Sequence, residues 1–242
     1  MGEFQPLISA ELRENWKAFL KINGLAGHSA PLDQAMIFSA NDLILVLPLL
    51  LLLAWFVVAR WSPWSRWLTT RFGPRVAESD RWLGQRALLS AVVGVVIALS
   101  LTILLGALIF EPRPFVSHPG LVHRLIPHPA DASFPSDHET VSMAIALTLV
   151  FYVIWQLRRA ARDRVGGGWL RAAPMLVVAL VALGCAVLIG FARVFVGVHY
   201  PVDIAGGAVS ALVGDLLAFG LIPLTRHIFS PIVRLATTLH LA

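Results

Sequence analysis

Three short stretches of this chain carry the residue types that phosphoryl transfer needs. The candidates are Arg113, Ser136, Asp137, His138, Arg193, His199 and Asp203. An arginine guanidinium is a permanently charged planar fork that binds two phosphate oxygens at once. A neutral histidine can attack phosphorus while a carboxylate on its other ring nitrogen fixes the tautomer. A second histidine can pass a proton to the departing oxygen. This combination predicts a site that transfers or hydrolyses a phosphate.

The segment around Ser136 also has the sequence of a helix start. Ser136 is a good N-cap residue, and Glu139 three residues later would complete a capping box. The free amides of such a helix start bind anions without a metal ion. Plainer explanations exist: Arg113 and Arg193 could anchor lipid headgroups, and His199 could be an ordinary loop histidine. The joint occurrence of these residues is what favours catalysis.

The rest of the chain is markedly apolar. Of its 242 residues, 57% are hydrophobic and 14% are charged, and the mean hydropathy is +0.77. Soluble domains are about a quarter charged. The composition therefore excludes a disordered chain, a disulfide scaffold and most soluble enzymes. The single cysteine, Cys185, lies inside an apolar run, so no internal disulfide and no cysteine-based metal site is expected.

Five apolar runs approach the length that a membrane-spanning helix requires. They are Leu43–Ala59, Ala87–Phe110, Val141–Trp155, Pro174–Val196 and Ile204–Leu224. The third run is short, but its helix is expected to begin at Ser136. Helices are predicted because each span must satisfy its own backbone hydrogen bonds in lipid, and because the runs lack the alternation of barrel strands. The expected fold is an all-α integral membrane protein, a bundle of about five transmembrane helices plus an N-terminal interfacial helix.

The loop charges predict how this bundle is oriented. Thirteen of the nineteen lysine and arginine residues fall in residues 60–86, in residues 156–173 and in the tail after Leu224. The positive-inside rule places these segments in the cytoplasm. The N-terminus and the candidate site are therefore expected outside, and the C-terminus inside. The net charge of +5 reflects topology and does not indicate nucleic-acid binding.

A short amphipathic helix is expected before the first span. Trp16, Phe19 and Leu20 share one helical face, and Asn23-Gly24 would end the helix. Such a helix could lie on the membrane surface or pack against the bundle. The sequence leaves both possibilities open.

The three stretches resemble, in order and spacing, the three-part signature of the type-2 phosphatidic acid phosphatase superfamily. The matches are Arg113-Pro114, Pro135-Ser136, His138, Arg193, His199 and Asp203. The resemblance covers roughly residues 87–224. Three positions depart from the signature: its lysine is Gly106, its glycine is Asp137, and its serine before the second arginine is Ala192.

A narrower resemblance accounts for one of these departures. The stretches Glu111–Phe115, Ala130–His138 and Val196–Asp203 are similar to undecaprenyl-pyrophosphate phosphatases of the bacitracin-resistance type. In that subgroup aspartate replaces the glycine, so Asp137 becomes a match. The resemblance implies an enzyme of the bacterial cytoplasmic membrane.

The resemblance also implies catalytic roles. His199 would attack the terminal phosphorus of a lipid pyrophosphate and form a phosphohistidine. Asp203 would hold the His199 imidazole, and His138 would protonate the leaving lipid monophosphate and then activate water. No metal and no cofactor are expected, since arginines and helix amides supply the positive field.

The remaining implied roles concern binding. Phosphate oxygens would contact Arg113, Arg193, Ser136 and the amides around Asp137, and the possible headgroup contacts are Glu111 and His128. The whole chain, residues 1–242, is expected to form a single membrane phosphatase domain. Within it, residues 1–42 would be an outer-face region containing the interfacial helix, and residues 87–224 the catalytic core.

The predicted reaction is hydrolysis of undecaprenyl pyrophosphate to undecaprenyl phosphate and inorganic phosphate, which recycles the lipid carrier for cell-wall synthesis. One alternative is a phosphatase or phosphotransferase acting on another lipid phosphate, such as phosphatidylglycerol phosphate or phosphatidic acid. A second alternative is a non-catalytic protein that binds or transports lipid phosphates. The expected partners are a polyprenyl pyrophosphate and membrane lipids, with no nucleic acid.

Two features fall outside this scheme. His118, His123 and His128 recur at five-residue spacing, which matches none of the familiar zinc patterns, so loop structure or headgroup contact is expected. Asp215 is expected roughly 18 Å deeper than Asp203 at the helical rise per residue. A carboxyl at that depth should face the bundle interior, either protonated or bonded to hydroxyl groups.

Overall fold

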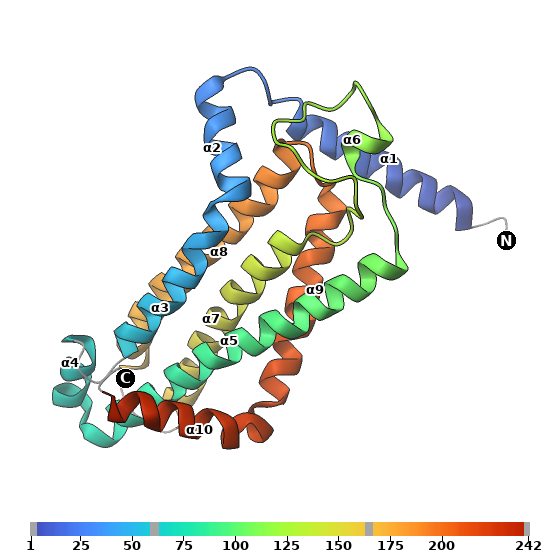
Figure 1. Cartoon of the computed structure of the whole chain (residues 1–242). Helices are drawn as coiled ribbons and strands as arrows, with labels where there is room; N and C mark the ends of the chain where they lie inside the picture. The colour runs from blue at the N-terminus through green and yellow to red at the C-terminus, as the bar shows by residue number, and fades with distance from the viewer. Residues whose placement is uncertain (1–3, 59–62, 163–166, 240–242) are drawn as a thin grey trace.

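The computed structural model describes residues 4–58, 63–162 and 167–239, and in these ranges the regular elements are helices (Figure 1). In chain order they are α1 (Phe4–Asn23), α2 (Ala30–Asn41), the 3₁₀ helix η1 (Leu43–Leu45), α3 (Val46–Val58), α4 (Pro63–Phe72), α5 (Pro74–Leu108), α6 (Pro114–Ser117), α7 (Asp137–Arg162), α8 (Gly168–Phe195), α9 (Pro201–Gly220) and α10 (Ile222–Thr238). Within the described ranges the only bridge between extended segments joins Pro112 to Ala132.

Five segments are long and apolar enough to cross a membrane: the one that begins at Leu43, and helices α5, α7, α8 and α9. This confirms the predicted all-α membrane fold with five spans. The bounds differ where polar residues extend a helix beyond its apolar run. Helix α5 begins at Pro74 rather than near Ala87, because Gly73 turns the chain at φ +88° and a proline suits the first helical turn.

The structure corrects the predicted end of the fifth span. The apolar run continues to Leu224, but α9 ends at Gly220 and the chain turns at Leu221 into α10. A proline in the first turn of α10 suits this restart, since its missing amide proton is not needed there. Helix α10 then runs across the end of the bundle instead of extending the span (Figure 1). Hydropathy could not locate this break because the residues on both sides are apolar.

Helix α7 forms the centre of the bundle and packs against α5, α8 and α9. Leu149 and Tyr152 of α7 are buried in one core with Ala179 and Ala182 of α8. Helices α5 and α9 approach closely, since a Cβ on Gly214 would lie only 2.7 Å from Ala98. Small residues at such contacts let membrane helices pack through their backbones.

Helix α1 packs against the bundle at its C-terminal end. Phe19 is fully buried with Val194 and Tyr200, and Trp16 lies beside them. Of the two possibilities that the sequence left open for this helix, its C-terminal turns therefore adopt the one in which it packs against the bundle. Asn23, the last residue of the helix, donates from Nδ2 to the carbonyls of His123 and Phe195, both at 2.8 Å. Its Oδ1 accepts the His123 amide at 2.9 Å, so one buried side chain fixes the long α6–α7 loop onto the end of α8.

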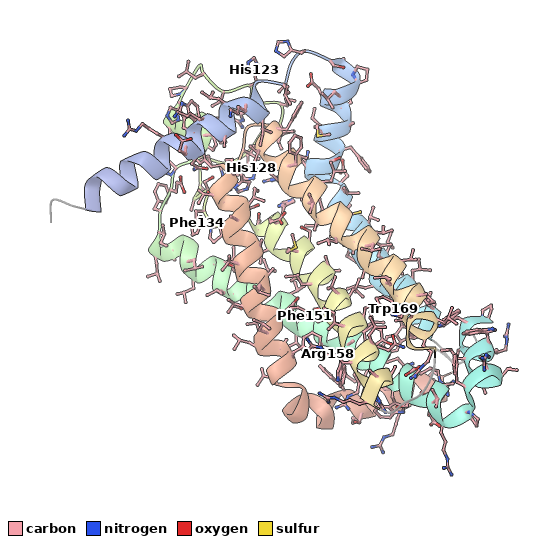
Figure 2. The ribbon with its side chains drawn as sticks, turned by 180° about the vertical axis from the view of Figure 1, so that it is seen from behind. His123, His128, Phe134, Phe151, Arg158 and Trp169 are labelled. Atoms are coloured by element: carbon pink, nitrogen blue, oxygen red, sulfur yellow. The ribbon has the colours of Figure 1, made fainter. Side chains whose placement is uncertain are left out.

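The two ends of the bundle differ in character. Figure 2 shows Arg158 and Trp169 at the end opposite His128. The arginine-rich ends of α4 and α7 lie with them, whereas the α6–α7 loop and the α8–α9 connection lie at the His128 end. The candidate residues are therefore concentrated at one end of the bundle.

Candidate active site

His199 lies in the tight connection between α8 and α9. The chain leaves α8 at Val196 and turns at Gly197, where φ is +84° and a Cβ would lie 2.8 Å from the His123 carbonyl oxygen. Only glycine suits that combination of positive φ and close approach. Helix α9 restarts at Pro201, which leaves the His199 side chain 1% exposed beneath the loop.

The hydrogen bonds of His199 define its tautomer. Nε2 faces Arg113 Nη1 at 3.1 Å and Arg193 Nη2 at 3.4 Å. Guanidinium groups only donate, so Nε2 must be the acceptor and the ring proton must be on Nδ1. Nδ1 in turn lies 3.3 Å from Asp203 Oδ2. The lone pair that can act as nucleophile is therefore on Nε2, between two cations.

Burial and charge keep this imidazole neutral. Desolvation lowers the pKa of His199 well below its ordinary value, and the positive charges of Arg193 and Arg113 lower it further. At neutral pH the ring therefore carries no second proton, and Nε2 keeps its lone pair.

Asp203 is held in the first turn of α9 by several donors. Its Oδ2 accepts a short hydrogen bond from the Ser133 hydroxyl and another from the Tyr200 amide at 2.8 Å. Ser133 Oγ also lies 3.5 Å from His199 Nδ1. Sequence reasoning gave Ser133 no role, although it lies inside a stretch that resembles the narrower subgroup. Asp203 is fully buried, and its Oδ1 has no hydrogen bond to any described residue.

Arg113 is buried and anchored on two sides. Its Nε donates to Asp131 Oδ1 at 2.7 Å, and its Nη1 donates to the Val198 carbonyl at 2.9 Å. Partial burial alone would raise the pKa of Asp131, but the hydrogen bond and charge of Arg113 outweigh it and lower that pKa. Asp131, which sequence reasoning left without a role, orients this guanidinium toward His199.

Arg193 is 1% exposed and has no carboxylate partner among the described residues. Its Nη1 donates to the Ala40 carbonyl of α2 at 3.4 Å, and its Nη2 lies 3.0 Å from His128 Nε2. Its Nε has no partner in the described part of the chain. A buried cation with spare donors is a strong binding point for an anion.

His128 completes the set around Arg193. Because Nε2 accepts from the guanidinium, the ring proton is on Nδ1, which lies 3.2 Å from the Pro129 carbonyl. Desolvation lowers the pKa of His128, so it is neutral at neutral pH. Figure 2 shows His128 below the loop and close to the bundle, with His123 farther out.

The other two loop histidines lie elsewhere. The His118 ring stacks on Trp16 at 3.8 Å between centroids, and His123 lies toward His28. The three histidines thus do not share one site. In the described residues no group of three or more His, Cys, Asp or Glu side chains is arranged to hold a metal ion.

The start of α7 brings Ser136, Asp137 and His138 to the same end. His138 Nδ1 lies 3.1 Å from Asp137 Oδ1, which also accepts the His138 amide at 2.8 Å. The Asp137 side chain is 61% exposed and interacts electrostatically with both His138 and His199. No hydrogen bond of the described residues joins His138 directly to His199.

The predicted capping box is only half formed. The Glu139 amide donates to Ser136 Oγ at 3.5 Å, so Ser136 is the N-cap. The Ser136 amide, however, donates to the Asp203 carbonyl at 3.1 Å instead of to Glu139. Glu139 is instead buried against Gly190 and Gly207, with Oε2 lacking a described partner. The start of α7 is thereby bonded directly to α9.

Two remaining positions lie at the edges of the site. Glu111 is half-buried next to Asp203, and Gly106 lies near the end of α5. A Cβ on Gly106 would lie 3.3 Å from the Phe134 carbonyl oxygen, which explains a small residue there. Deeper in the bundle, Asp215 is fully buried beside Thr148 and against Gly94.

A helical membrane bundle with a buried His–Asp pair beneath two arginines defines an integral-membrane lipid phosphatase. The chain belongs to the PAP2 superfamily, whose family model matches residues 87–226. This confirms the superfamily resemblance found in the three stretches around Arg113, Ser136 and His199.

Two curated relatives are similar in sequence, and a solved structure shares the fold. The chain is 34% identical to the undecaprenyl-diphosphatase BcrC of Bacillus subtilis over 91% of both proteins. It is 28% identical to the putative undecaprenyl-diphosphatase YbjG of Escherichia coli over 84% of this chain and 80% of that protein. The crystal structure of Aquifex aeolicus LpxE has the same fold, with a TM-score of 0.53 and 20% identity over 85% of this chain and 94% of that chain.

Proposed function

We propose that this protein hydrolyses undecaprenyl pyrophosphate to undecaprenyl phosphate and inorganic phosphate. The proposal is supported by the names of its relatives and, above all, by the position of His199 Nε2 between the two buried guanidinium groups. The catalytic core is residues 87–224, with residues 1–42 contributing the Ala40 carbonyl that holds Arg193.

In the first step, the Nε2 lone pair of His199 attacks the terminal phosphorus. A P–N bond forms, and the bond from that phosphorus to the bridging oxygen breaks. His138 gives its proton to the departing lipid monophosphate. Asp203 stabilises the positive charge that develops on the imidazole, because its Oδ2 accepts from Nδ1.

In the second step, water attacks the phosphohistidine from the side that the lipid has left. The P–N bond breaks, the water proton passes to His138, and inorganic phosphate departs. Arg113 and Arg193 donate to the phosphate oxygens in both steps, where a preorganised cation in a dry site is most effective. The α7 amides near Asp137 and the Ser136 hydroxyl contribute further donors. Glu111 and His128 flank the headgroup.

We place the site at the outer face of the bacterial cytoplasmic membrane, with the N-terminus outside and the C-terminus in the cytoplasm. The arginine-rich end of α7 supports this placement, because it lies opposite the His128 end and marks the cytoplasmic side (Figure 2).

The test is phosphate release from undecaprenyl pyrophosphate by detergent-purified protein with excess chelator. We expect the wild type to turn over and His199→Ala to lose activity. His28→Ala is the matched control, since His28 is an exposed histidine at the same end. Turnover retained in His199→Ala would refute the nucleophile assignment.

A substrate panel separates the alternatives. Faster release from phosphatidylglycerol phosphate or phosphatidic acid would assign a different lipid phosphate. Lipid binding without release, unchanged in His199→Ala, would indicate a binding or transport protein. Transfer of labelled phosphate to an added alcohol instead of water would indicate a phosphotransferase.

A further inference from the structure

A cleft of about 390 Å³ lies between α1, the segment from Glu111 to His118, and Tyr200. Arg13 and Trp16 line its α1 side, and Glu111 and Tyr200 line the side next to the candidate site. Of the residues that line this cleft, the proposed reaction uses only Glu111, beside the headgroup. Glu111 is half-buried, so its carboxyl can exchange protons with solvent there.

Glu111 is connected to the nucleophile through Ser133 and Asp203. The Ser133 amide donates to the Glu111 carbonyl at 2.8 Å, and the Ser133 hydroxyl donates to Asp203 Oδ2. The carboxyl groups of Glu111 and Asp203 also interact with each other directly. Asp203 is fully buried, and its Oδ1 has no hydrogen-bond partner assigned among the described residues.

Two adjacent carboxyl groups can hydrogen-bond only if one of them holds a proton. Asp203 already accepts from the Ser133 hydroxyl and the Tyr200 amide and faces His199 Nδ1. These donors stabilise the ionised form of Asp203. Burial raises the pKa of Glu111 to about 7, and the neighbouring Asp203 adds to the rise. The shared proton therefore belongs on Glu111.

We propose that Glu111 is a positioning residue for the nucleophile, whose protonated carboxyl donates a hydrogen bond to Asp203 Oδ1 and holds Oδ2 against His199 Nδ1. This inference rests on the proposed function. When Glu111 loses its proton, the bond is lost and a second negative charge faces Asp203. Nδ1 is then held less well, and the nucleophile is less well aligned.

The other charged and titratable groups near this pair keep their own roles. Arg13 and His118 line the same cleft, and Tyr200 forms its wall. Arg113, which binds Asp131, also interacts electrostatically with Asp203. Because several groups surround the pair, a pH profile of the wild type alone cannot assign a limb to Glu111, and the test must compare variants.

The experiment measures kcat/KM for undecaprenyl pyrophosphate against pH, for wild type, Glu111→Gln and Glu111→Ala. The glutamine amide keeps a donor but cannot ionise, whereas alanine removes it. We expect Glu111→Ala to lose about tenfold at pH 6, as loss of one buried hydrogen bond would, and Glu111→Gln to recover most of that loss. The wild-type profile should fall above pH 7 with a limb that Glu111→Gln lacks. Ser117→Ala, on the same cleft, should keep the wild-type profile.

The outcomes separate this inference from the proposed function. Equal losses in Glu111→Gln and Glu111→Ala, with the alkaline limb unchanged, would mean that Glu111 is only structural. That result leaves the His199 mechanism intact, provided that His199→Ala is inactive. Activity in His199→Ala would overturn the mechanism itself. Size-exclusion elution and thermal unfolding in detergent establish that each variant is folded.

Discussion

Two buried arginines, at opposite ends of the bundle, are used in opposite ways. Arg171 of α8 is 4% exposed and binds Asp80 of α5 through two hydrogen bonds, at 2.6 and 2.8 Å. Arg193 of the same helix is 1% exposed, but its guanidinium meets a carbonyl and two histidine nitrogens. One charge is neutralised within the protein, and the other is not.

In the proposed function, this difference separates an arginine that stabilises the fold from one that binds the substrate phosphate. Burying a charge costs several kcal/mol unless it is paired. The Asp80–Arg171 pair offsets that cost and leaves little field for another anion. The Ala40 carbonyl and His128 hold Arg193 in place without neutralising its charge, which leaves that charge available for the phosphate of the proposed substrate. Burial alone therefore does not distinguish these two arginines, whereas the absence of a carboxylate partner for Arg193 among the described residues does.

The largest expected effect comes from removing the unneutralised charge. Arg193→Ala should lower kcat/KM about 100- to 1,000-fold, the range for loss of one preorganised donor to transition-state charge. Arg193→Lys should recover only part of this, because lysine cannot form the planar fork. The measurement is steady-state phosphate release by folded protein. Wild-type activity in Arg193→Ala would contradict the phosphate-binding role that distinguishes Arg193 from Arg171.

The next largest effect is expected at the opposite end, on stability instead of catalysis. Asp80→Ala leaves Arg171 buried without its partner, which should cost about 3–5 kcal/mol of unfolding free energy. The double variant Asp80→Leu/Arg171→Met removes both charges and should be more stable than Asp80→Ala. Denaturant unfolding in detergent micelles measures this. The activity of the folded fraction of Asp80→Ala should stay near that of the wild type. A loss of activity as large as that of Arg193→Ala would mean that the Asp80–Arg171 pair is not purely structural.

A smaller effect is expected where Asn23 clamps the α6–α7 loop. Asn23→Ala removes three hydrogen bonds, worth about 3 kcal/mol in total. Amide exchange in residues 118–128 should accelerate, and kcat/KM should fall several-fold because the loop carries His128. Asn41→Ala, an exposed asparagine at the end of α2, is the control and should change neither. Unchanged exchange in Asn23→Ala would show that the loop is held by other contacts.

The smallest effect concerns acidic pH. A histidine of ordinary pKa, about 6.5, would be roughly nine-tenths protonated at pH 5.5 and lose its nucleophile accordingly. Burial and the two arginines lower the pKa of His199 well below that value, so protonation should begin only at lower pH. Wild-type kcat/KM should therefore fall less than about twofold between pH 6.5 and 5.5. Arg113→Gln, which removes one of these charges, should shift the acidic limb toward higher pH.

The fold was largely predictable because a lipid environment leaves few choices. Five apolar runs predict five helices, and the structure has them. Hydropathy could not find α4 and α10, nor the polar first turns of α5. It also could not distinguish the packed end of α1 from a surface helix, because the same apolar face serves either contact. That choice depends on Phe19 meeting Val194 and Tyr200, which are far away in sequence.

For the site, spacing identified the charged residues but not what orients them. Arg193, His199 and Asp203 lie within eleven residues, so their proximity follows from a helix end and a turn. Arg193 donates to the Ala40 carbonyl and Arg113 to the Val198 carbonyl, and no side-chain pattern reports such backbone partners. Ser133 and Asp131 are ordinary loop residues until the folded loop brings them against Asp203 of α9 and against Arg113.

The hydrogen bonds at His199 Nε2 also determine which electrophiles can react there. Both guanidinium groups donate to this nitrogen, so any reacting centre must first draw these donors away. A phosphate does so because it offers anionic oxygens in exchange. A carboxylic ester offers only a weak neutral acceptor, so the two guanidinium groups remain hydrogen-bonded to His199 Nε2 and occupy its lone pair. In the proposed mechanism, this nitrogen would therefore react with phosphate groups in preference to the acyl esters of membrane lipids, and charge would set the selectivity of the site before shape does.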